Sequence, residues 1–139
     1  MAVSTEPSLG VAYLISKVVA EPHPHTIASG LEDPYPWDAD CAMEGVTETG
    51  GQGETADDSE ILEAVRDLAR CEGVFAEPSG AAALAGARKM RAGGAIDRDQ
   101  VVVVLVTGSG LKDVEALRKL VGPVPTIEPS ISELSRVLL

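Results

Sequence analysis

A glycine-rich segment in the last third of the chain combines residue types that can bind a polar ligand. It runs Thr107-Gly108-Ser109-Gly110-Leu111-Lys112-Asp113 and directly follows an apolar run, Val101 to Val106. Gly108 and Gly110 give backbone freedom and exposed amides, and the two hydroxyl groups can donate or accept hydrogen bonds. A helix starting here would favour an anion or a polar ring atom. The alternative is a tight turn with helix caps only, since the spacing matches neither the dinucleotide fingerprint nor the phosphate-binding loop.

Glu77 is the second candidate, because it stands just before a predicted helix start at Ser79-Gly80. Its carboxylate could face a ligand site, or it could only interact with the positive end of the helix dipole. His23 and His25, with an acidic neighbour such as Glu21 or Asp38, could in principle hold a metal ion. Their spacing does not follow the ligand patterns of zinc sites, so we expect no metal site.

The elements that must position these residues follow from hydrophobic periodicity. Asp57 and Glu60 have the spacing of a capping box, and the apolar face after them predicts a helix over residues 58–71. An Ala-rich helix should cover residues 81–91 and end at Gly93-Gly94. Residues 101–106 lack alternation, which is typical of a strand covered on both faces in a parallel sheet. A helix should follow over residues 111–121.

The remaining elements complete one domain. A strand at residues 17–20 and a helix at residues 37–49 are expected, and five prolines make residues 21–36 a connecting segment. Ser130 could cap a last short helix through residue 137. The sequence of helices and strands predicts a single α/β domain over residues 1–139, built as a three-layer parallel-sheet structure.

Composition excludes several kinds of partner. Eleven basic and 22 acidic residues give a net charge of −11, so a basic footprint for nucleic acid is missing. No apolar run approaches the roughly 20 residues that span a bilayer, and the amino terminus shows no secretory signal, which favours a cytoplasmic location. We expect Cys41 and Cys71 to be reduced and packed.

Three segments, taken together, resemble the C-terminal part of threonine synthase, a pyridoxal-phosphate enzyme of fold type II (the tryptophan synthase β-like fold). They are residues 26–31, residues 72–86 and residues 104–113, which read TIASGL, EGVFAEPSGAAALAG and VLVTGSGLKD. The resemblance covers residues 26–121, whereas residues 1–25 and 123–139 are poorly matched ends. Related threonine dehydratases share the Ala-rich segment but usually have a Ser-Gly-Gly-Asn type turn in place of the third.

The resemblance implies roles for the candidate residues. Thr107 would hydrogen-bond the pyridine nitrogen of pyridoxal phosphate, and Glu77 would lie near the hydroxyl edge of the ring. Gly108, Ser109 and Gly110 would shape the turn beside it. The family reaction converts O-phosphohomoserine and water to threonine and phosphate.

The chain departs from the family in the residues of the covalent chemistry. Its lysines are Lys17, Lys89, Lys112 and Lys119, and none stands in the family's Schiff-base motif. The family's phosphate-cradling glycine loop is also missing, because Gly50-Gly51-Gln52-Gly53 fits a turn between a helix and a strand. We therefore expect no covalent cofactor and no turnover by this chain alone.

Two hypotheses follow for the function. The chain is either part of an enzyme that a complementary chain completes, or a non-catalytic small-ligand binder or interaction module built from the same fold. The first predicts an exposed apolar face and a homodimer or a partner chain. The second predicts a stable particle that binds no aldehyde covalently.

Overall fold

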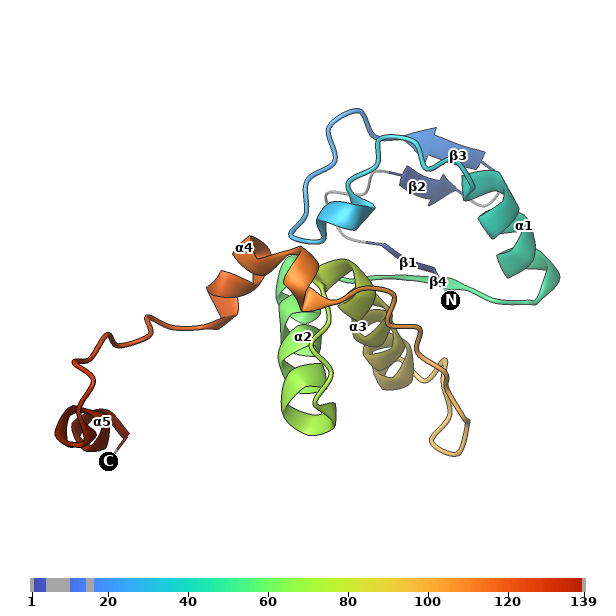
Figure 1. The fold of residues 1–139 in the computed structure, drawn as a ribbon. Helices are drawn as coiled ribbons and strands as arrows, with labels where there is room; N and C mark the ends of the chain where they lie inside the picture. Colours follow the sequence, from blue (N-terminus) through green and yellow to red (C-terminus); the bar gives the residue numbers. More distant parts are fainter. Residues whose placement is uncertain (1, 5–10, 15–16, 139) are drawn as a thin grey trace.

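Figure 1 shows the computed structural model, which describes residues 2–4, 11–14 and 17–138, with side chains from residue 21 onward. In chain order the elements are the strands β1 (Ala2–Ser4), β2 (Val11–Leu14) and β3 (Lys17–Ala20), the 3₁₀ turn η1 (Ser29–Leu31), helix α1 (Ala39–Glu48), strand β4 (Gly53–Thr55), helices α2 (Asp58–Glu72) and α3 (Pro78–Ala92), the 3₁₀ turn η2 (Gly110–Lys112), helix α4 (Val114–Leu117), the 3₁₀ turn η3 (Arg118–Leu120) and helix α5 (Ile131–Leu138).

The helix pair α2 and α3 forms the centre of the molecule, and both predicted helices are confirmed. The capping box at the start of α2 is complete: the Asp57 carboxylate accepts a hydrogen bond from the Glu60 amide at 2.8 Å, and the Glu60 carboxylate accepts one from the Asp57 amide at 2.8 Å. Gly73 ends α2 in the left-handed conformation, at φ 68°.

Small side chains let the two helices approach closely. The buried face of α2 consists of Ile61, Ala64, Val65 and Leu68. The buried residues of α3 are Pro78, Gly80, Ala81, Ala82, Ala85, Gly86, Ala87 and Met90. The core is therefore aliphatic and Ala-rich, and its largest fully buried side chains are Ile61, Val65 and Pro78.

The strands form two separate pairs. β1 pairs with β4 in parallel, with Ala2 opposite Gly53, and β2 pairs with β3 antiparallel, with Val11 opposite Ala20. The expected strand at residues 17–20 and the expected helix at residues 37–49 are thus present as β3 and α1. The described residues combine helices with short strands, but they do not form the three-layer parallel sheet.

The prediction of a central strand at residues 101–106 is wrong for this structure. None of the described strands pairs with the segment, and Val101, Val103 and Leu105 are 95%, 81% and 71% exposed. Val102, Val104 and Val106 on the other face are less exposed, and Val106 packs against the core. The segment therefore has one face towards the core and one open face. It forms no strand in this structure, because a strand also needs backbone partners along its edges.

The helix expected over residues 111–121 is interrupted. Two side chains cap short turns in succession: Ser109 accepts a hydrogen bond from the Leu111 amide, and Asp113 accepts one from the Ala116 amide. The result is η2, α4 and η3 in place of one continuous helix. Such local caps compete with a regular helix.

The carboxyl-terminal helix α5 is confirmed, and the Ser130 hydroxyl accepts a hydrogen bond from the Glu133 amide at 3.2 Å. Both cysteines are free and exposed, so the expectation that they are packed is wrong. Cys71 lies on the outer face of α2, and Cys41 lies on α1, where only Ala39 is buried. Within the part of the chain that the structure describes, no helix is long and apolar enough to cross a membrane.

Candidate functional site

The glycine-rich turn is attached to the segment before α3 by a short antiparallel bridge. Ala76 lies opposite Ser109, the Glu77 amide donates a hydrogen bond to the Gly108 carbonyl at 3.0 Å, and the Gly110 amide donates one to the Phe75 carbonyl at 2.9 Å. These backbone contacts bring together Glu77 and the turn, which are 30 residues apart in the sequence. The two candidate groups therefore form one site.

Two glycines permit this close approach. A Cβ on Gly108 would occupy the position of the Glu77 carboxylate. A Cβ on Gly80, in the first turn of α3, would lie 3.2 Å from the backbone nitrogens of both Thr107 and Gly108. The start of α3 therefore packs directly against the backbone of the turn.

An ion pair closes one side of the site. Lys112 Nζ lies 3.3 Å from Glu77 Oε1, and the Glu77 side chain is 14% exposed whereas that of Lys112 is 68% exposed. The ammonium group is thus mostly hydrated, and the pair adds little stability. The Glu77 carboxylate is mostly buried and lies beside Gly108.

The segment around η1 joins the same site. The Ser29 hydroxyl donates a hydrogen bond to Asp113 Oδ2 at 3.0 Å, and the Gly30 amide donates one to the Ser79 hydroxyl at 3.1 Å. The three segments that carry the resemblance are therefore adjacent in space.

A part-buried hydrogen bond fixes the position of this loop. The Thr26 hydroxyl donates to Asp58 Oδ1 at 2.6 Å, and the same carboxylate oxygen accepts from the Ile27 amide at 3.0 Å. Thr26 is the buried polar residue of the core. This anchor connects the loop to the first turn of α2.

The candidate residues differ in accessibility. Thr107 and Ser109 are exposed, and no hydrogen bond within the described residues engages the Thr107 hydroxyl. Gly110 is buried against Phe75 and Leu117. The Thr107 hydroxyl is consequently exposed and makes no hydrogen bond to the described residues.

The proline-rich segment contributes no ligand group to this site. His25 pairs with Glu32, with Nδ1 to Oε1 at 3.2 Å, and the exposed His23 donates its backbone amide to the Glu21 carboxylate. Among the described residues, no group of three or more histidine, cysteine or acidic side chains could hold a metal ion.

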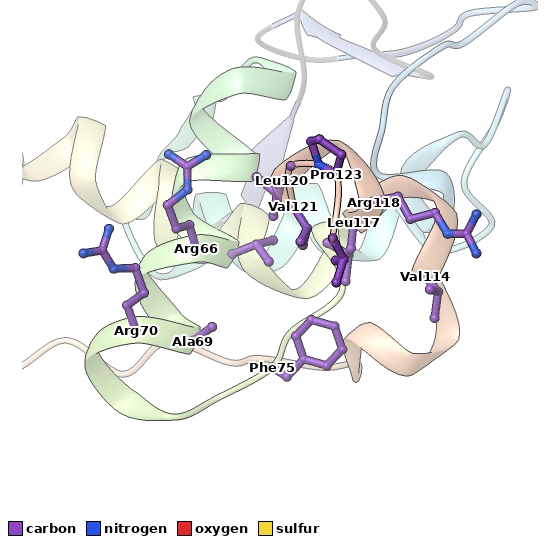
Figure 2. Close-up of a pocket in the computed structure, with 13 residues that line it drawn as sticks. Arg66, Ala69, Arg70, Phe75, Val114, Leu117, Arg118, Leu120, Val121 and Pro123 are labelled. Atoms are coloured by element: carbon purple, nitrogen blue, oxygen red, sulfur yellow. The ribbon is translucent and has the colours of Figure 1, made fainter. Parts of the chain in front are cut away.

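Sequence reasoning missed an apolar cavity of about 710 Å³ that lies between α2 and the segment from α4 to Val124. Figure 2 shows Phe75, Leu117 and Val121 around it, with Arg66 and Arg70 on the α2 side and Arg118 on the opposite side. The sequence indicates only its rim, because Arg66 and Arg70 are four residues apart and so share one face of α2.

Comparisons with known proteins define the class. Residues 1–108 match the family described as "Pyridoxal-phosphate dependent enzyme". This match covers more than half of the chain, and the chain therefore belongs to that family.

The relatives are more specific, since they are named threonine synthase. The protein of Methanocaldococcus jannaschii is 37% identical over 121 residues, which is 87% of this chain and 30% of that protein. The protein of Methanosarcina acetivorans is 43% identical over 69% of this chain and 24% of its own length. The protein of Mycobacterium leprae is 40% identical over 84% of this chain and 34% of its own length. The chain thus corresponds to part of a threonine synthase and spans about a third or less of these relatives.

The described residues fit one edge of a pyridoxal ring. Thr107 offers an unengaged hydroxyl, and Glu77 offers a carboxylate on the neighbouring strand-like segment. A phosphate loop is not among the described elements, because residues 50–53 connect α1 to β4 as the sequence predicted. Of the described lysine side chains, Lys89 pairs with Glu60 at 3.2 Å and Lys112 pairs with Glu77.

Proposed function

We propose that this chain is a threonine synthase-like protein that supplies the ring-nitrogen side of a pyridoxal-phosphate site and does not catalyse turnover alone. The observation that carries the proposal is the convergence of three segments on the turn at residues 107–110. The name of the relatives gives the class of reaction, formation of threonine. The resemblance implies O-phosphohomoserine as the substrate and phosphate as the second product. A cytoplasmic location suits such a role in amino-acid biosynthesis.

Each residue of the turn has a physical task in this proposal. The Thr107 hydroxyl would hydrogen-bond the pyridine nitrogen, and a neutral partner leaves that nitrogen largely unprotonated. Glu77 would orient the hydroxyl edge of the ring, and its carboxylate lies beside Gly108 and pairs with Lys112. When bound, the cofactor supplies an electron sink for carbanion chemistry, and the protein supplies binding and orientation.

The covalent step needs an amine that this turn does not provide. Lys112 is paired with Glu77, Lys89 is paired with Glu60 on the neighbouring helix, and Lys119 lies in η3, outside the turn. A complementary chain would bring the lysine and the phosphate loop. The proposal therefore predicts reversible binding of pyridoxal phosphate without a lysine adduct.

The test is an absorbance titration of the purified chain with pyridoxal phosphate, followed by borohydride reduction and peptide mapping. We expect a saturable spectral change with no single lysine fixed by reduction. Thr107→Ala should weaken this binding about tenfold, which corresponds to one hydrogen bond of about 1.4 kcal/mol. Thr126→Ala is the matched control, since Thr126 is an exposed threonine far along the chain.

Two results would contradict the proposal. A lysine fixed in high yield would mean that the chain forms its own Schiff base and contains a complete covalent site. Equal affinity of the Thr107→Ala and Thr126→Ala proteins would remove the turn from the binding site.

The second candidate function is a non-catalytic binding or interaction module. The exposed face of residues 101–105 favours it, because an unpaired apolar segment can accept another chain. Absence of any saturable effect of pyridoxal phosphate, with a stably folded chain, would favour this candidate over the first.

A further inference from the structure

The cavity between α2 and the segment from α4 to Val124 has the size and lining of a docking site. Its volume of about 710 Å³ falls in the range of ligand and peptide pockets, and its wall is mainly aliphatic around Phe75, Leu117 and Val121. Arg66 and Arg70 stand at its edge, and no ion pair among the described side chains involves either of them. The site therefore suits an apolar element with acidic groups beside it.

Helix α5 has the complementary surface. None of its residues is buried, and one stripe carries Ile131, Leu134 and Leu138, which are 85%, 47% and 72% exposed. Positions that are three, four and seven residues apart share one face of a helix. The arm before α5 also carries Glu128, an exposed acidic residue that no described ion pair engages.

The connection to α5 disfavours docking of this helix into the cavity of its own chain. The arm leaves the edge of the cavity at Val124, and only residues 125–130 lie between this point and α5. Pro125 and Pro129 are among these six residues, and each favours extended backbone at the residue before it, so the arm runs away from the cavity in this structure. Figure 1 accordingly shows α5 at the end of an extended segment, away from the other helices.

We propose that α5 docks into this cavity of a second copy of the chain, and that two chains exchange their helices around a twofold axis. Each arm begins beside the cavity of its own chain, so a reciprocal exchange fills both cavities with the same contacts. The apolar stripe of α5 would face Phe75 and Leu117, and Glu128 would approach Arg66 and Arg70. This interface adjoins the turn at residues 107–110 through Gly110, which packs against Phe75 and Leu117, but it includes neither Thr107 nor Glu77.

The first test measures self-association of the full chain by sedimentation equilibrium. We expect a dimer, and we expect Leu134→Asp to raise its dissociation constant by about tenfold or more, since a charge would enter the apolar cavity. Ser132→Asp is the matched control, with the same added charge on the same exposed helix but one, two and six residues from the stripe positions, and should leave the dissociation constant within about threefold. Circular dichroism checks that both variants keep the fold. A monomeric parent chain, or equal effects of the two variants, would overturn the proposal.

The second test locates the contact with native Cys71, which is exposed and adjacent to Arg70. In a Cys41→Ser, Ser135→Cys protein, a short bismaleimide should join residue 135 to Cys71. Mixing isotopically labelled and unlabelled chains distinguishes the two geometries. Cross-linked peptides that contain one labelled and one unlabelled half support the exchange between copies. Cross-links found only within one chain overturn it and place α5 in its own cavity.

Discussion

The α2–α3 pair and the segment at residues 101–106 are both apolar, yet only the first buries its apolar side chains fully. Ile61 and Ala81 are completely buried, whereas Val101 and Val103 are 95% and 81% exposed. The helices satisfy their own backbone hydrogen bonds and need only each other's side chains, and they are separated by five residues. A central strand of a sheet needs paired strands on both edges as well as packed side chains on both faces. Hydrophobicity therefore determines burial only where the partner surface is also present.

The largest expected change in stability comes from removing a buried apolar side chain, and the same change in the open segment is the comparison. Ile61→Ala should lower the free energy of unfolding by about 2–5 kcal/mol, because it loses burial and leaves a cavity between α2 and α3. Val103→Ala should change it by less than about 0.5 kcal/mol, since the side chain is already in water. Urea denaturation followed by circular dichroism measures both. Similar losses in the two variants would mean that residues 101–106 are buried in solution.

A smaller effect on stability is expected at the start of α2, where local hydrogen bonds add to the packing of α2 against α3. Asp57→Ala should cost about 1 kcal/mol, because the carboxylate that accepts hydrogen bonds from the Glu60 amide and the Ser59 hydroxyl is lost. Asp57→Asn is the control that keeps a capping group without a titrating charge. Equal stability of Asp57→Ala and the parent chain would show that the cap contributes nothing.

The same residue gives this prediction a pH dependence. The hydrogen bond from the Ser59 hydroxyl, and then that from the Glu60 amide, hold the pKa of Asp57 below its ordinary value of 3.8. A carboxyl group with a lowered folded-state pKa stabilises the fold above its unfolded value and loses this contribution as the pH falls through the folded value. The advantage of the parent chain over Asp57→Ala should therefore be constant above about pH 5 and shrink below 3.8. The Asn variant should not show this additional loss.

The contrast also explains which parts of the fold could be predicted from sequence. The capping box at Asp57 and the Gly73 end are local signals, and α2 was predicted within one residue of its observed limits. The run at 101–106 carries the composition of a central strand, but pairing depends on neighbours that a residue pattern cannot supply.

The candidate site shows the same division. The turn at residues 107–110 and Glu77 were recognisable as separate motifs, and the bridge between Ala76 and Ser109 brings them side by side. The cavity beside Arg66 and Arg70 was not predicted, because it depends on how residues 114–124 pack against α2 after the expected helix is interrupted. The interruption follows from the local caps at Ser109 and Asp113, which hydrophobic periodicity does not detect.

The smallest expected change in stability comes from a charge on the open face of the 101–106 segment. Val103→Lys should alter the free energy of unfolding by less than about 0.5 kcal/mol, because the side chain contacts solvent. It should nevertheless reduce aggregation on heating, since a lysine on an unpaired apolar segment opposes pairing with another chain. Light scattering during a temperature ramp measures this effect, with Val103→Ala as the uncharged control. If Val103→Lys unfolds the chain or fails to slow aggregation relative to Val103→Ala, the open face of this segment is covered in solution, and the contrast with the α2–α3 pair no longer holds.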